Sequence, residues 1–183
     1  MTHHTYSHIA ENNKEAERIF NKAGMRLLNS NFWCKVFDNA APCRLFNKNG
    51  NEVNRLIKKN DFFRLGYKID EVTNPEVFEW VSVENIESYT DSSLEMELFT
   101  VIVKPAPYPF VEGESNKEHF SRTDVNTALS IKRESGKVTI ELHKSMTPLS
   151  SSEGRSKAGA HRKLPVYTVP AKTWEKIIAE LFS

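Results

Sequence analysis

Two side chains that could take part in catalysis, Glu141 and His143, alternate with apolar residues between positions 138 and 142. In a β-strand this alternation places both on the polar face, about 7 Å apart. A carboxylate and an imidazole at that spacing can bind a metal ion or share a proton once a third group joins them. The candidates for that group are His119 and Asp124. The four residues predict a small hydrolase or a metal-dependent enzyme, and the alternative is a solvated strand face.

A second group of candidates is aromatic. The segments around Phe62-Phe63 and around Phe78 and Trp80 place rings on both faces of predicted strands. Most large rings belong in a core, but some could line a surface groove, beside the proline-rich residues 105–109. We therefore predict a ligand-binding surface, and the residues assigned to it are Phe63, Tyr67, Trp80 and Tyr108.

A third candidate is a local basic patch within residues 147–163, a segment rich in serine, glycine and charge. Cations in such a loop can neutralise phosphates. No aromatic residues alternate with these cations, although binding of single-stranded nucleic acid usually requires aromatic rings on which the bases stack. A solubilising loop is the alternative reading, because charge runs usually face solvent. The basic residues are Arg155, Lys157, His161, Arg162 and Lys163.

Composition restricts the remaining classes of function. Twenty-five basic and 24 acidic side chains give a formal charge of +1, which provides no general attraction to nucleic acid or to an anionic membrane. Short signatures for nucleotide, serine-hydrolase or zinc-protease sites are absent, so we expect no cofactor and no metal. The histidines His3, His4 and His8 lie in a segment that we expect to be flexible, residues 1–11.

The cysteines and the N-terminal sequence bear on location. Cys34 and Cys43 have no metal-ligand spacing, and we expect two free thiols. The first residues lack a basic start followed by an apolar stretch, and no segment reaches the length of a membrane span. We therefore expect a cytoplasmic protein.

Periodicity predicts the elements that would position these residues. Helical spacing covers residues 13–29, with Asn12 as its cap, and a second helix begins near Pro170. Between them period two predominates and predicts a mostly antiparallel sheet. The predicted strands are residues 32–37, 44–46, 53–57, 62–65, 77–83, 94–103, 128–133 and 137–143.

Within residues 33–87, the Asn49-Gly50 turn and the lysine-containing turn at residues 58–61 precede a strand, and a Trp80-Val81 pair follows. This order of pieces is similar to bacterial SH3-like barrels. Asn60-Asp61 replaces the usual glycine of that turn. The whole chain looks like a bacterial protein family that embeds such a barrel in further strands and helices. The resemblance implies binding of a peptide or of cell-wall fragments.

These observations predict an α+β fold in a single domain, residues 1–183, with an antiparallel, partly barrel-like sheet and helices at both ends. Residues 94–183 supply the additional strands, the loop and the C-terminal helix. We expect a non-catalytic binding or interaction module whose partner is a peptide or another protein. The hydrolase and nucleic-acid readings remain as alternatives, and the sequence leaves the oligomeric state open.

Overall fold

The computed structural model describes residues 2–36, 43–67, 77–106, 123–148 and 171–183. Three helices and seven strands lie in these ranges. In chain order they are β1 (Thr2–Ile9), α1 (Asn13–Leu27), α2 (Ser30–Val36), β2 (Arg44–Phe46), β3 (Phe62–Tyr67), β4 (Val77–Asp91), β5 (Met96–Ala106), β6 (Thr123–Glu134), β7 (Lys137–Pro148) and α3 (Ala171–Phe182).

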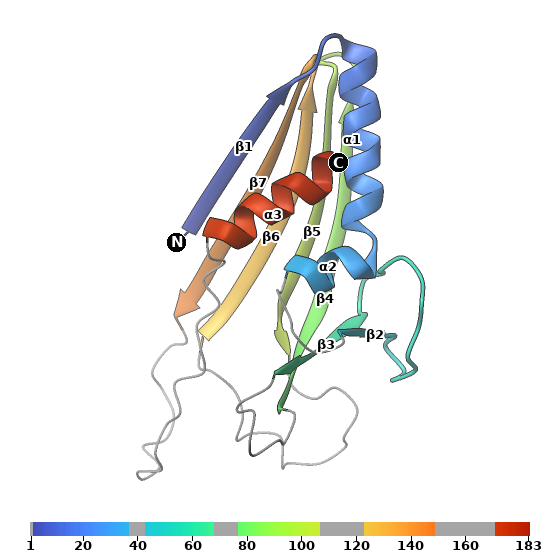
Figure 1. Cartoon of the computed structure of the whole chain (residues 1–183), viewed down its shortest axis with the longest axis vertical. Coiled ribbons are helices and arrows are strands. Elements are labelled where there is room, and N and C mark those ends of the chain that lie inside the picture. The colour runs from blue at the N-terminus through green and yellow to red at the C-terminus, as the bar shows by residue number, and fades with distance from the viewer. Residues whose placement is uncertain (1, 37–42, 68–76, 107–122, 149–170) are drawn as a thin grey trace.

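The strands form one antiparallel sheet in the order β1-β7-β6-β5-β4-β3-β2 (Figure 1). Each strand from β2 to β6 pairs with the next along the chain, whereas β1 pairs with the last strand, β7. The sheet is open, with β1 and β2 at its two edges, so the predicted α+β class is confirmed and no closed barrel is seen. Residues 33–87 contain part of α2 and contribute β2, β3 and part of β4 to this larger sheet.

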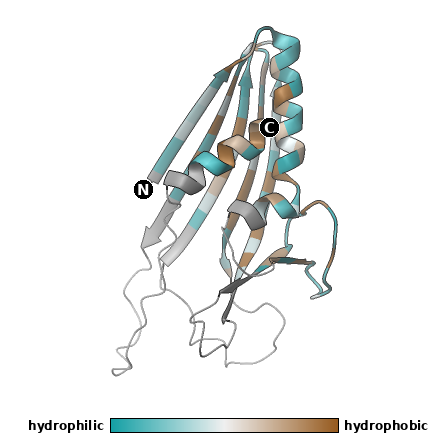
Figure 2. Cartoon of the chain, in the orientation of Figure 1, coloured by the Kyte–Doolittle hydropathy of each residue, from teal (hydrophilic) through white to brown (hydrophobic). Residues whose placement is uncertain are grey.

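The hydrophobic core lies on one face of the sheet, beneath the three helices (Figure 1). We call this the core face and the opposite side the outer face. Along the strands, residues that point to the core face alternate with residues that point away from it, and hydrophobic and hydrophilic colours accordingly alternate in Figure 2. The fully buried strand residues include Val83, Val101, Leu129, Ile131, Val138 and Ile140.

Helix α1 begins where the sequence predicted, because the Asn12 side chain accepts a hydrogen bond from the backbone N–H of Glu15 at 2.9 Å. Its buried residues recur at helical spacing and pack against the core face. At its other end, the Arg26 guanidinium donates to the carbonyls of Glu180 and Leu181 at 2.9 and 3.2 Å. The positive charge meets the negative end of α3, which joins the two terminal helices.

Helix α2 corrects a prediction, because most of the segment 32–37 is helical rather than a strand. A short apolar run is compatible with the period of a helix and with that of a strand, and in this segment tertiary contacts select the helix. Phe32 and Trp33 are both buried although they are consecutive, which a strand with one covered face would not allow. The Trp33 indole N–H also donates to the carbonyl of Leu27 at 2.7 Å and so attaches α2 to the end of α1.

Strand β1 corrects a second prediction, that residues 1–11 form a flexible lead-in. Thr2–Ile9 pair with Lys144–Lys137 of β7 without a register shift. The segment is polar, and it appears in mostly pale and teal shades in Figure 2. Its strand character therefore comes from a partner about 130 residues away rather than from its own hydrophobic pattern.

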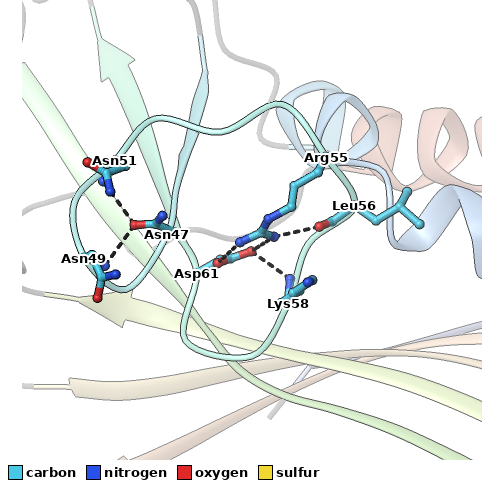
Figure 3. A network of polar contacts seen from close by, with 7 residues as sticks. All are labelled: Asn47, Asn49, Asn51, Arg55, Leu56, Lys58 and Asp61. Carbon is cyan, nitrogen blue, oxygen red and sulfur yellow. Dashed lines mark hydrogen bonds and ion pairs between the residues drawn. The ribbon is translucent and has the colours of Figure 1, made fainter.

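The loop between β2 and β3 contains the predicted turns at 47–51 and 58–61, but the strand predicted at 53–57 is reduced to one isolated bridge, Asn29–Leu56. Two side chains organise the loop (Figure 3). The side-chain amide oxygen Oδ1 of Asn47 accepts from the backbone N–H groups of Asn49 and Asn51. Asp61 binds the Arg55 guanidinium and the backbone N–H of Lys58.

The remaining strands agree with the predicted sheet but are longer. β5 continues to Ala106, beyond the predicted end at residue 103, and β4 continues to Asp91, beyond the predicted end at residue 83. The predicted hairpin is confirmed as β6 and β7, with Ser135 at a φ of 49° in its turn. Thr147 and Pro148 belong to β7, and the rest of the predicted loop 147–163 lies outside the described residues.

The expectation of two free thiols is wrong, because Cys43 is disulfide-bonded. It lies one residue before β2. Disulfides persist mainly in oxidising compartments. This bond therefore gives no support to the predicted cytoplasmic location.

Candidate functional site

Glu141 and His143 lie on β7 and point to the outer face, as their alternation predicted. The His143 ring packs edge-on against His3 of β1, with ring centroids 6.0 Å apart. The His3 ring nitrogen Nε2 is 3.2 Å from the Thr5 hydroxyl. Within the described ranges, no group of three histidine, cysteine or carboxylate side chains is placed to hold a metal ion.

The strand register separates two of the predicted catalytic residues. Asp124 lies opposite Thr147, while His143 lies opposite Ala128. The distance along the strand from position 124 to position 128 is about 13 Å, well beyond hydrogen-bond reach. His119, the remaining candidate, lies outside the described residues. The enzyme reading therefore stays a prediction that rests on Glu141 and His143.

The aromatic candidates are divided between the two faces of the sheet. Phe63 has no exposed surface and packs in the core, where its ring centroid is 6.1 Å from that of Trp33. Trp80 is 8% exposed and lies on the outer face, where it contacts Phe46 at 5.2 Å. Packing is thus the observed role of both Phe63 and Trp80. Tyr67 lies at the end of β3, its side chain outside the description, and Tyr108 lies outside the described residues.

The outer-face cluster around Trp80 includes a cation. The Arg64 guanidinium carbon lies 5.5 Å from the centroid of the Phe46 ring, a cation–π arrangement. Arg44 is directly opposite Arg64 in the register and forms an exposed ion pair with Glu52 at 2.8 Å. The predicted basic patch at 155–163 lies outside the described residues, so its role stays a prediction.

A buried cation that the sequence analysis did not select lies on the core face. Lys144 follows Val138, Ile140 and Leu142 in the period-two pattern of β7. Only 7% of its surface is exposed. Burial lowers the pKa of its ammonium group from the ordinary value of 10.5, because removal of water disfavours the charged form. The period-two pattern could have revealed this residue, since it predicts an inward side chain at position 144.

The surroundings of Lys144 are polar on both neighbouring strands. Thr127 of β6 and Thr2 of β1 lie directly opposite it in the register. His4, which is half-buried, lies opposite Leu142 and is thus a diagonal neighbour, about 7–8 Å away. Lys144 and His4 each also take part in other interactions within the chain. We call Lys144, His4 and Thr127 the polar end of the core face.

The polar end continues directly from the apolar core. Leu142 and Leu129 are a register pair, both buried, and the next core-facing residues along the two strands are Lys144 and Thr127. On β1, Tyr6 and His8 contact the ring of Phe182 at the end of α3, with centroids 5.4 and 5.5 Å apart. The core face therefore changes from aliphatic to polar along the strands and toward β1.

Comparison with known proteins does not identify this arrangement. The chain matches no protein-family model and no curated protein. Among the described residues, no helix combines the length and the apolar composition that crossing a membrane requires.

Proposed function

We propose that the chain is a non-catalytic binding module that holds a small amphipathic anion on the core face. The acidic group of the ligand contacts the Lys144 ammonium, and its apolar part packs at the edge of the aliphatic core. The observation that carries the proposal is the position of Lys144, which is buried and follows three core residues in the strand pattern.

The energetic argument concerns the cost of burying a charge. Removing an ammonium group from water costs several kcal/mol, and hydrogen bonds or opposite charges must offset that cost. Methionine or leucine would fit the same inward position without this penalty. Lys144 has interactions within the chain that offset part of this cost, and a bound anion would offset more of it. Buried groups with perturbed pKa values are common at functional sites, which supports a recognition role for this lysine.

The arrangement of the neighbours fits one class of ligand. Leu142 and Leu129 are buried core residues that border the polar end. A hydrocarbon or ring system bound beside Lys144 would extend this apolar core at its edge, and the polar end supplies hydrogen-bonding groups at Thr127 and His4. Small-molecule sites usually combine such an apolar lining with a few polar groups that fix orientation. A carboxylate or sulfonate on an apolar body meets both requirements.

The experiment compares two fluorescent probes that differ in charge. Anilinonaphthalene sulfonate has an acidic group, and phenylnaphthylamine has a similar aromatic body without one. We expect wild-type protein to bind the sulfonate more tightly. Lys144→Met should weaken the sulfonate by about tenfold, the value of one charge-assisted hydrogen bond, and leave the neutral probe unchanged.

Two further variants make the test specific. Lys144→Arg keeps the charge and should retain most of the sulfonate affinity. Lys137→Met removes an exposed lysine from the same strand and should have no effect. Circular dichroism establishes that each variant is folded. The proposal is rejected if wild-type protein binds neither probe, or if folded Lys144→Met binds the sulfonate as tightly as wild type does.

A further inference from the structure

Strand β1 has one free edge. It is the terminal strand of the sheet, and its eight residues pair with β7 on one side only (Figure 1). A free edge presents a row of backbone N–H and C=O groups that another strand can complete. Successive residues of a strand direct their backbone N–H and C=O groups to opposite sides, so only every second residue of β1 directs these groups to the free edge.

The hydrogen bond from the Ala10 N–H to the Gly136 carbonyl, at 2.9 Å, fixes that alternation. Ala10 directs its backbone groups toward the β6–β7 hairpin, so the other even-numbered residues of β1 direct theirs toward β7. The odd-numbered residues therefore direct their N–H and C=O groups to the free edge. These residues are His3, Thr5, Ser7 and Ile9.

The edge of β1 lacks the features with which proteins usually prevent strand pairing. Thr2–Ile9 contain no lysine, arginine, carboxylate or proline, and their register with β7 has no bulge. The opposite edge differs. β2 has only three residues, and the loop that follows covers its outer side through the Val53 N–H donated to the Leu45 carbonyl and the Phe46–Glu52 bridge. Only the β1 edge therefore combines length with an open backbone among the described strands.

Side chains on β1 add apolar surface to this edge. Tyr6 is 39% exposed and Ile9 is 80% exposed, and they lie on opposite faces of the sheet. Aromatic residues that are exposed on a monomer are enriched at protein interfaces. The strand thus offers both backbone pairing and hydrophobic contact to a partner.

We propose that the partner is β1 of a second copy, paired antiparallel about a two-fold axis through Tyr6. Directly opposite residues must share a face, so their numbers must have the same parity. With the axis at Tyr6, His3 faces Ile9 of the partner subunit and Thr5 faces the partner's Ser7. Every backbone group that β1 directs to its free edge then gains a hydrogen bond.

Charge and symmetry favour this occupant. At neutral pH β1 has no formally charged side chain, so two copies do not repel each other when they pair. A two-fold contact uses the same surface twice and closes, which gives a discrete dimer rather than a fibre. The non-hydrogen-bonded positions place Tyr6 against its own copy, where the two rings can pack.

The test measures the oligomeric state of the full chain by sedimentation velocity. We expect a dimer. Thr5→Pro removes an N–H that points only to the free edge, and proline is tolerated at such edge positions. It should convert the dimer to a folded monomer, whereas Thr5→Val, which keeps the N–H, should remain dimeric.

A second pair of variants tests the position of the axis. Tyr6→Lys would place two like charges directly opposite each other and should weaken the dimer at least tenfold, while Tyr6→Phe should leave it intact. A wild-type chain that sediments as a monomer at about 100 μM, far above most stable dimer constants, overturns the proposal. So does a dimer that survives Thr5→Pro, because it must then use another surface.

Discussion

The Arg55 guanidinium binds both carboxylate oxygens of Asp61, at 2.6 and 2.9 Å, and the Asp61 side chain is only 3% exposed. The same carboxylate accepts from the backbone N–H of Lys58 at 2.7 Å (Figure 3). The backbone carbonyl of Asp61 accepts from the N–H of Val83 in β4. This one pair thus closes the loop between β2 and β3 and attaches it to the sheet. A bidentate pair of this kind has both strength and a fixed geometry.

Asp61→Asn should therefore destabilise the fold by about 2–4 kcal/mol, because it leaves a half-buried guanidinium without its charge partner. Urea unfolding measures the effect. The matched control is Glu52→Gln, which removes the partner of Arg44 from an exposed ion pair and should cost less than about 0.5 kcal/mol. Equal losses for the two variants would show that burial of the Arg55–Asp61 pair has no special effect.

Glu84 predicts a dependence of stability on acid pH. Burial raises the pKa of its carboxyl group, but hydrogen bonds from Lys104 and Ser82 outweigh burial and hold the pKa below the ordinary value of 4.5. Stability from this group is complete above pH 4.5 and is lost as the pH falls through the lowered pKa. The urea midpoint of unfolding should decrease between neutral pH and about pH 3, and this decrease should be larger for wild type than for Glu84→Gln. Lys104→Met should likewise show a smaller decrease in the urea midpoint than wild type. Equal decreases for wild type and both variants would contradict the prediction.

Lys144 predicts the opposite trend at alkaline pH. Burial lowers the pKa of its ammonium group below 10.5, so the folded protein binds fewer protons than the unfolded chain between the two values. Stability from this group must then rise as the pH increases toward 10.5. As the pH rises toward 10.5, the melting temperature of Lys144→Met should fall relative to that of wild type. Parallel pH profiles for the two proteins would mean that the lysine is not held in a desolvated site.

Gly24 offers a stabilising substitution. It lies inside α1, and a Cβ atom added there would have an ordinary contact, 3.9 Å, with Cδ1 of Phe99. Alanine loses less conformational entropy than glycine on folding. Gly24→Ala should therefore increase the free energy of unfolding by about 0.5–1 kcal/mol, measured by urea unfolding. A decrease would indicate that Phe99 cannot accommodate the methyl group.

Helix α1 and the β6–β7 hairpin followed from the sequence because their signals are local. Asn12 caps a helix whose apolar residues recur at the correct spacing, and the hairpin residues alternate on either side of a tight turn. The same alternation placed Glu141 and His143 on the outer face. It also contained the inward position of Lys144, which was overlooked because the apolar residues alone were assigned to the core.

Tertiary structure decided the elements whose signals are not local. β1 is a strand because β7 pairs with it, and α2 is a helix because Phe32 and Trp33 are both covered. Register, which no single segment contains, separated Asp124 from His143 and brought His4 close to Lys144. The sequence by itself determined which faces of the chain are apolar, since that depends on residue order alone. Only the folded sheet decided which polar groups meet, because the pairing of distant strands determines their neighbours.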